Sequence, residues 1–196
     1  MTEEQFSAAV LAGKGLIAAM HERDHGTARH LNRVASLSER LAQHLELADI
    51  EVKQTRATAL YHDIGKIAVP DEPLFKPGPL SPAERATMQT HPEIGERILK
   101  ATENRFLGSI AVFVRHHHER FDGSGYPDGL AGNTIPLVAQ IVSIADAYDA
   151  IASERPYRPT QRHETTVATL AAEVGQKWNA DLFDALVKMF EKGKPQ

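Results

Sequence analysis

Two adjacent residues, His62 and Asp63, have side chains that could do metal chemistry, and they lie within ALYHDIGKI, an otherwise apolar stretch. Burying an imidazole beside a carboxylate is costly unless something compensates their charge. A metal ion would do so, because neutral imidazole supplies a nitrogen ligand and a carboxylate can bridge two ions. A buried, hydrogen-bonded His-Asp pair without metal is the alternative that this segment alone leaves open.

Other histidines and aspartates lie in comparable settings, and each is ambiguous when taken alone. Asp146 lies in the apolar stretch IVSIADAYDAI, where a buried aspartate often serves only to hydrogen bond between helices. His30 lies in TARHLNRV, and His91 could be an ordinary residue at a helix start. The segment RHHHERFDGSGYPDG places three consecutive histidines beside a glycine-rich loop. The combined set is far more specific than any member: His30, His62, Asp63, His91, His117, His118 and Asp146.

The elements that must position this set are predicted to be helices, because apolar residues recur at helical spacing along most of the chain. The expected fold class is all-α, a bundle whose helices can project side chains toward one interior site. Beyond an N-terminal helix, helical segments are expected at residues 27–47, from about residue 49, and at residues 104–118, 135–152, 163–174 and 180–191.

Breaker and capping residues divide these helices. Helix breakers cluster in PDEPLFKPGPLSP, residues 70–82, which is predicted to be an ordered loop. Ser81-Pro82-x-Glu84 and Thr90-x-x-Glu93 are helix-start signals, and the second leaves His91 at the start of a helix. The segment DGSGYPDG is a strong turn signal, because glycine permits positive φ. It is expected to form a shaped loop that closes one side of the site.

Composition excludes several classes of protein. The 196 residues fit one domain or one and a half, and a net charge of −4 argues against a nucleic-acid polymer or an anionic membrane as a partner. The absence of cysteine excludes disulfides and thiolate zinc sites. MTEEQF lacks the features of a signal peptide, and no apolar run is long enough for a membrane span. A cytoplasmic protein is therefore expected.

Three motifs together resemble one known family. HDIGK, HHERFDGSGYP, and IADAYDAI followed by RPYRP are similar to the motifs of the HD-GYP family, a branch of the HD superfamily of metal-dependent phosphohydrolases. The resemblance covers about residues 22–192. It implies an HD-domain helical bundle of about seven to nine helices with a GYP loop beside a metal site. The expected division is an N-terminal helix at residues 1–21 and an HD-GYP domain at residues 22–196.

The resemblance implies a centre of two divalent metal ions, iron or manganese, bridged by Asp63. Ligands that offer only nitrogen and oxygen are consistent with those metals. Two ions about 3.5–4 Å apart can lower the pKa of a bridging water and clamp the transferring phosphate. Gly26 stands where some family members carry a glutamate that helps to hold a third metal. The implied ligands besides Asp63 are His30, His62 and Asp146 for one ion and His91, His117 and His118 for the other.

Phosphodiester cleavage also needs positive charge around the phosphate. Lys66 lies one turn after His62; alone it would be interpreted as a solvated lysine, but the resemblance implies that it contacts the scissile phosphate. Arg155 and Arg158 match the family's substrate-binding basic residues, and guanidinium groups suit phosphate oxygens. Asp63 and Lys66 are thus the expected catalytic residues, and Lys66, Arg155 and Arg158 the expected substrate-binding ones.

The implied activity is hydrolysis of cyclic di-GMP to pGpG, GMP or both in bacterial second-messenger signalling. The alternatives are another substrate, such as 3′,3′-cyclic GMP-AMP, or a catalytically weak or inactive signalling module. The family's GYP segment, here Gly125, Tyr126 and Pro127, is also implicated in binding diguanylate cyclase domains, and a homodimer is considered. His116 precedes the expected ligand pair and is expected to hold no metal.

Overall fold

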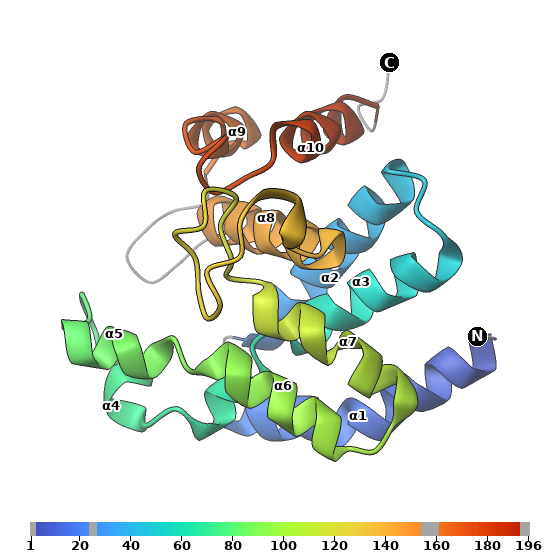
Figure 1. Ribbon diagram of the computed structural model, residues 1–196, viewed down its shortest axis with the longest axis vertical. Coiled ribbons are helices and arrows are strands. Elements are labelled where there is room, and N and C mark those ends of the chain that lie inside the picture. Colours follow the sequence, from blue (N-terminus) through green and yellow to red (C-terminus); the bar gives the residue numbers. More distant parts are fainter. Residues whose placement is uncertain (1–2, 24–26, 154–160, 193–196) are drawn as a thin grey trace.

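The computed structural model describes residues 3–23, 27–153 and 161–192, and Figure 1 shows their arrangement. These residues form helices and no β-strand, so the prediction of an all-α fold is confirmed. The α-helices are α1 (Glu3–Arg23), α2 (Thr27–His44), α3 (Asp49–Tyr61), α4 (Asp71–Leu74), α5 (Pro82–Met88), α6 (His91–Ala101), α7 (Arg105–His116), α8 (Leu137–Ala152), α9 (His163–Ala171) and α10 (Ala180–Lys192). The 3-10 helices are η1 (Ile64–Ala68) and η2 (Gly132–Thr134).

Three groups of buried apolar residues hold the described helices together. The first, which includes Leu99, joins α1, α3, α6 and α7, and the second, which includes Leu186, joins α2, α8, α9 and α10. The third, which includes Val142, lies where α2, α3 and α8 meet. Figure 1 shows the first group of helices at one end of the molecule and α9 and α10 at the other. The third group of buried residues, on α2, α3 and α8, therefore connects the two ends of the molecule.

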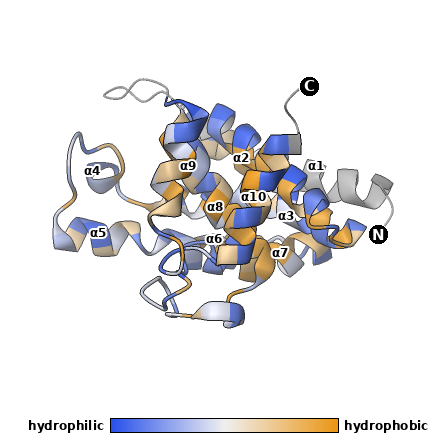
Figure 2. Ribbon diagram, turned by 90° about the horizontal axis from the view of Figure 1, so that it is seen from above, coloured by the Kyte–Doolittle hydropathy of each residue, from blue (hydrophilic) through white to orange (hydrophobic). Residues whose placement is uncertain are grey.

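The apolar spacing seen in the sequence explains which helical faces are buried. Leu31, Val34 and Leu41 lie on the expected stripe of α2 and are almost completely inaccessible. In Figure 2 apolar residues cover much of α7 and α8 in the middle of the molecule. None of the helices in the described ranges is long and apolar enough to cross a membrane.

The helix start predicted at Ser81 is confirmed, whereas other local predictions are wrong in detail. The Ser81 hydroxyl accepts from the Glu84 backbone N–H at 3.3 Å, and the Glu84 carboxylate accepts from the Ser81 N–H at 2.7 Å. At Thr90 the hydroxyl donates to the Thr87 carbonyl instead, so no side-chain cap forms, although α6 does begin at His91. Residues 70–82, expected to be a loop, contain the short helix α4.

The N-terminal helix α1 packs against the first group of core helices. Leu16, Ile17 and Met20 lie in the same apolar core as α3 and α7. At the end of α1, the Arg23 guanidinium donates to the Val69 carbonyl at 2.5 Å and to the Asp71 carboxylate at 2.7 Å. The division at residues 1–21 and 22–196 stays a prediction, but these contacts attach α1 to the segment that follows η1.

A close backbone approach joins η1 to α6. A Cβ atom at Gly65 would lie 1.9 Å from the His91 carbonyl oxygen and 2.7 Å from the Gly95 nitrogen. Both of these neighbours are backbone atoms, so they cannot move aside as a flexible side chain could. Gly65 is therefore needed because the chain directly after Asp63 runs against the first turn of α6.

We expect Gly65→Ala to lower the free energy of unfolding by about 3 kcal/mol, because η1 must separate from α6. Gly108→Ala is the matched control, since a Cβ atom at Gly108 in α7 meets nothing within 4 Å. That change should raise stability by about 0.5–1 kcal/mol, as alanine is the better helix former. Urea unfolding followed by circular dichroism measures both. Equal effects of the two substitutions would contradict this account of the η1–α6 contact.

Candidate metal centre

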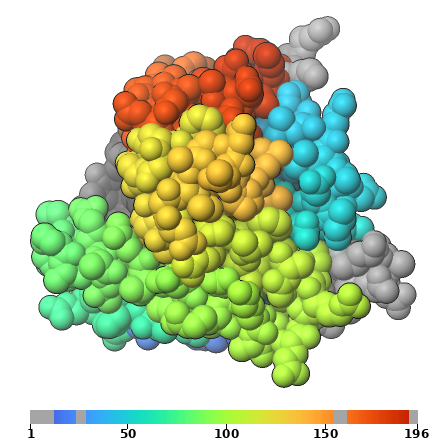
Figure 3. Space-filling view, in the orientation of Figure 1, coloured from blue at the N-terminus to red at the C-terminus, as the bar shows by residue number. Residues whose placement is uncertain are grey.

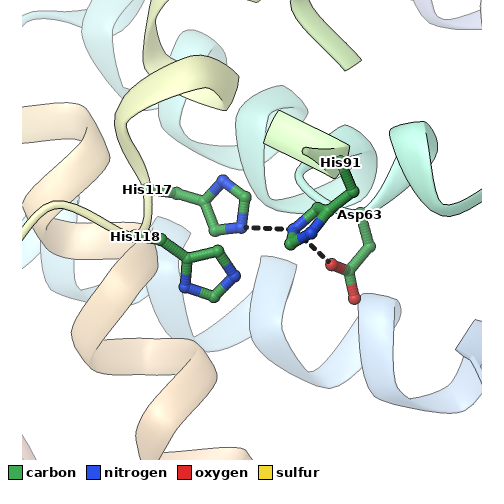
Figure 4. Close-up of side chains that lie close together, drawn as sticks. All are labelled: Asp63, His91, His117 and His118. Carbon is green, nitrogen blue, oxygen red and sulfur yellow. Dashed lines mark hydrogen bonds and ion pairs between the residues drawn. The ribbon is translucent and has the colours of Figure 1, made fainter. Parts of the chain in front are cut away.

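Two clusters of potential metal ligands lie side by side and share one residue, Asp63. The histidine-rich cluster contains Asp63, His91, His117 and His118, and Figure 4 shows these side chains turned toward one another. The α2 cluster contains His30, His62 and Asp63. Within each cluster the potential ligand atoms all lie within 4.8 Å of one another. Each group could hold a metal ion, and together the two clusters contain six of the seven residues that the sequence singled out as ligands.

Asp63 faces the two clusters with different oxygen atoms. Its Oδ1 lies 3.4 Å from His91 Nε2, on the side of the histidine-rich cluster. Its Oδ2 lies 3.3 Å from His62 Nε2, on the side of the α2 cluster. Asp146, on α8, lies beside the α2 cluster: its Oδ1 is 3.2 Å from His30 Nε2 and 3.9 Å from His62 Nε2.

Helix ends fix the orientation of three of the histidines in the same way. The Nδ1 atoms of His62, His91 and His117 bond the carbonyls of Ala59, Met88 and Val114 at 2.7–2.8 Å. These carbonyls belong to the last turns of α3, α5 and α7, where a carbonyl has no partner within its own helix. Each bond requires a proton on Nδ1, so the lone pair of the neutral ring is on Nε2 and points into the clusters.

These Nε2 atoms lie in surroundings that suit a cation. His91 Nε2 and His117 Nε2 are 3.5 Å apart, although in the tautomer fixed by the carbonyls neither carries a proton to donate. His62 Nε2 is buried and has no hydrogen-bond partner. Facing lone pairs and an unsatisfied buried nitrogen are each unfavourable. A bound metal ion would remove both penalties, so the residues present fit a metal centre.

The histidine-rich cluster keeps its imidazoles neutral in the metal-free protein. Burial lowers the pKa of His91 to about 4 and that of His117 to about 3. Burial also holds the pKa of His118 well below its usual value, and the neighbouring His117 lowers it further. These rings therefore need to lose no proton before they bind a metal near neutral pH.

In the α2 cluster the pKa values of the histidines are raised instead of lowered, because carboxylates surround them. Burial would lower the pKa of His30, but Asp146 and Asp149 outweigh it and raise this pKa to about 9. For His62 burial also opposes the charged form, yet Asp63 raises its pKa overall. Burial disfavours the Asp63 carboxylate, but Lys66 and His62 hold its pKa well below the usual range. Without metal, the carboxylates around the α2 cluster thus favour the charged form of both histidines.

Asp149, outside the predicted ligand set, orients His30. Its Oδ2 accepts from His30 Nδ1 at 2.8 Å, and the Arg33 guanidinium donates to both of its oxygens at 2.6 and 2.9 Å. The interaction leaves His30 Nε2 facing Asp146. The sequence offered a signal for this contact, since Asp149 is one helical turn after Asp146.

The loop after α7 is tied to the helix that carries the histidine run. The Glu119 carboxylate accepts from the backbone N–H groups of Asp128 and Leu130 at 2.7 and 3.1 Å. His116 Nε2 contacts Asp128 Oδ2 at 2.8 Å and lies outside the two clusters that share Asp63. The Tyr126 ring stacks on His118 with a centroid distance of 4.8 Å. The glycine-rich segment thus forms a fixed wall of the site.

Of the three cationic residues expected to bind substrate, the structure describes one, Lys66. Lys66 Nζ lies 2.7 Å from Asp63 Oδ2, and its expected contact with the scissile phosphate stays a prediction. The expectation that Lys66 continues the helix of His62 is wrong, because α3 ends at Tyr61 and Lys66 lies in η1. Arg155 and Arg158 lie outside the described residues.

A cavity of about 200 Å³ opens beside the clusters, and the sequence analysis did not identify most of its walls. His118 and Asp146 are shared with the metal centre, whereas Arg120, Lys177 and Trp178 are new. Its lining residues are His118, Glu119, Arg120, Tyr126, Ser143, Asp146, Ala147, Lys177 and Trp178.

Residues 14–182 match the model of one protein family, the HD domain. The chain belongs to the HD domain family. The family expected from the sequence motifs is thus confirmed, and the histidines and aspartates of the two clusters come from the HD domain of this chain. A solved structure of an HDG"Y"P protein from Bdellovibrio bacteriovorus has the same HD-domain fold, with a TM-score of 0.64 at 23% identity over 83% of this chain and 51% of that chain.

Curated relatives of this HD domain protein are phosphodiesterases by name. It is 42% identical to the cyclic di-GMP phosphodiesterase response regulator RpfG of Xanthomonas campestris, over 88% of this chain and 46% of the relative. It is 36% identical to 3′3′-cGAMP-specific phosphodiesterase 2 of Vibrio cholerae, over 89% of this chain and 33% of the relative. The chain therefore spans less than half the length of either relative.

Proposed function

We propose that this HD domain is a metal-dependent phosphodiesterase that hydrolyses cyclic di-GMP to pGpG, GMP or both. The observation that carries the proposal is the position of Asp63, whose two oxygens face two different ligand clusters. A carboxylate placed in this way is suited to bridging a pair of metal ions. Metal pairs of this kind are used by phosphatases and nucleases, which act on phosphate esters.

We propose two ions, each held by Asp63 and three further side chains. Iron or manganese is proposed because the family resemblance implies these metals, and nitrogen and oxygen donors without thiolate are consistent with both. When bound, such ions neutralise phosphate charge and lower the pKa of water. The proposed ligands besides Asp63 are His91, His117 and His118 on one side and His30, His62 and Asp146 on the other.

The chain's own residues would orient the substrate and offset its charge. The Lys66 ammonium lies 2.7 Å from Asp63 Oδ2, so a phosphate bound at the clusters would lie within its reach. As a charge-assisted donor it would stabilise the negative charge that develops on the phosphate oxygens. The Tyr126 ring stacks on the ring of His118 and would hold it in place. Arg155 and Arg158 remain proposed substrate contacts on the strength of the family resemblance.

The choice of substrate rests on the relatives. Cyclic di-GMP comes first because the 42% identical relative is named for it. A 3′,3′-cyclic GMP-AMP phosphodiesterase is the second candidate, since a 36% identical relative is named for that substrate. Both molecules are cyclic dinucleotides with two phosphodiester bonds, so the proposed chemistry at the clusters is the same.

Partners and location belong to the proposal as well. Diguanylate cyclase domains are proposed partners of the GYP segment, Gly125 to Pro127, as the family resemblance implies. Tyr126 packs on His118, so a partner that displaces this segment would also disturb the histidine-rich cluster. A homodimer and a cytoplasmic location stay predictions.

Activity is tested by incubating the anaerobically purified, metal-loaded protein with cyclic di-GMP and 3′,3′-cyclic GMP-AMP in parallel, followed by chromatography of the products. Cyclic di-GMP should be converted faster. Asp63→Asn should lower kcat by roughly 1,000-fold or more, because the amide has no negative charge and only one oxygen with which to hold the two proposed ions. The proposal is wrong if the wild type turns over neither substrate or if Asp63→Asn has the wild-type rate.

Metal content tests the assignment of the histidine run. His117→Ala should lose at least one metal equivalent, because His117 Nε2 points into the histidine-rich cluster. His116→Ala is the matched control on the adjacent residue and should retain both metals, since His116 Nε2 contacts Asp128 instead. Elemental analysis after anaerobic purification measures both variants. Loss of metal in His116→Ala with retention in His117→Ala would reverse the assignment.

A further inference from the structure

Two cations with no role in the proposed metal centre, Arg120 and Lys177, line the cavity beside it. The same cavity contains His118, from the histidine-rich cluster, and Asp146, from the other side of the centre. Its volume of about 200 Å³ is below the 300–1,000 Å³ that pockets for whole drug-sized ligands occupy. The cavity therefore fits one part of a larger ligand whose reacting group lies at the clusters.

Backbone hydrogen bonds bring these two cations together from distant parts of the chain. The Phe121 N–H donates to the Lys177 carbonyl at 3.3 Å, and the Asp122 N–H donates to the Gln176 carbonyl at 2.8 Å. The loop after α7 is thus attached to the connection between α9 and α10. Figure 3 shows the loop and α8, in yellow and orange, lying against the red C-terminal helices. Arg120 and Lys177 are neighbours because of this attachment.

The interactions of Arg120 differ from those of other arginines near the site. Arg115 donates to the carboxylates of Asp128 and Glu96, and Arg33 donates to Asp149. Arg120 makes no ion pair with any residue in the described part of the chain, and its Nη1 lies 3.4 Å from the Ser124 hydroxyl. A guanidinium that lines a cavity without a carboxylate partner is available to an anion.

Lys177 is held at the cavity by two neighbours. Its ammonium pairs with Glu173 one turn earlier and lies 5.9 Å from the centroid of the Trp178 ring. The ammonium can bind a second oxygen ligand while it keeps the first, because it has three N–H donors.

We propose that Arg120 and Lys177 bind the second phosphate of a cyclic dinucleotide, the one that is not being cleaved. The inference rests on the proposed function, which places the scissile phosphate at the clusters. The second phosphate needs positively charged partners when it leaves water. Arg120 and Lys177 supply this positive charge next to the metal centre and would favour substrates with two phosphates.

The test compares a substrate that has two phosphates with one that has a single phosphate. Arg120→Gln and Lys177→Gln should each raise KM for cyclic di-GMP roughly tenfold, the effect of losing one charge-assisted hydrogen bond. The loss of kcat/KM should be much smaller for bis(p-nitrophenyl) phosphate, which has only the scissile phosphate. Lys188→Gln, which removes a lysine of α10 that does not line the cavity, is the matched control and should leave both KM values unchanged.

The control substrates separate the outcomes. KM for 3′,3′-cyclic GMP-AMP should rise as much as KM for cyclic di-GMP, because both carry the second phosphate; a loss limited to one of them indicates a base contact and overturns the inference. Arg120→Lys and Lys177→Arg keep the charge and should restore most of the affinity, which also tests the inference if a glutamine variant does not fold. An active wild type with unchanged KM in both glutamine variants overturns this inference alone, whereas an inactive wild type overturns the proposed function.

Discussion

The rest of the site depends on the buried carboxylate of Asp63. A buried charge is costly unless it is compensated, and the residues nearest to the Asp63 carboxylate come from three different elements. His62 comes from the end of α3, Lys66 from η1 and His91 from the start of α6. The close approach at Gly65 holds the last two of these elements together. The packing of η1 against α6 therefore also determines which side chains surround the Asp63 carboxylate.

Helix ends provide the second constraint. Three histidines bond carbonyls in the last turns of α3, α5 and α7, so unsatisfied helix termini fix the tautomers of the rings. The helices must therefore end where they do: if α7 continued through residue 118, His117 could not use the Val114 carbonyl in this way. The backbone orients these three histidines, whereas His30 takes its orientation from the Asp149 carboxylate.

Much of this arrangement could be predicted from sequence, because apolar periodicity identifies the helices and the His-Asp doublet is conspicuous in an apolar stretch. The cap predicted at Thr90 does not form, because the Thr90 backbone is already helical (φ −80°, ψ −15°) instead of extended as a capping residue requires. The helical position expected for Lys66 was wrong, since apolar spacing does not reveal that a 3-10 turn follows α3. Arg120 and Lys177 were missed because two long-range backbone bonds unite them, and no residue spacing encodes such a contact.

Anomalous diffraction from crystals of the metal-loaded protein would show whether Asp63 bridges two metal ions, as we propose. We expect two peaks roughly 3.5–4 Å apart, with one oxygen of Asp63 on each. The first should lie among His91, His117 and His118, and the second among His30, His62 and Asp146. A single peak, or two peaks of which only one contacts Asp63, would contradict the claim.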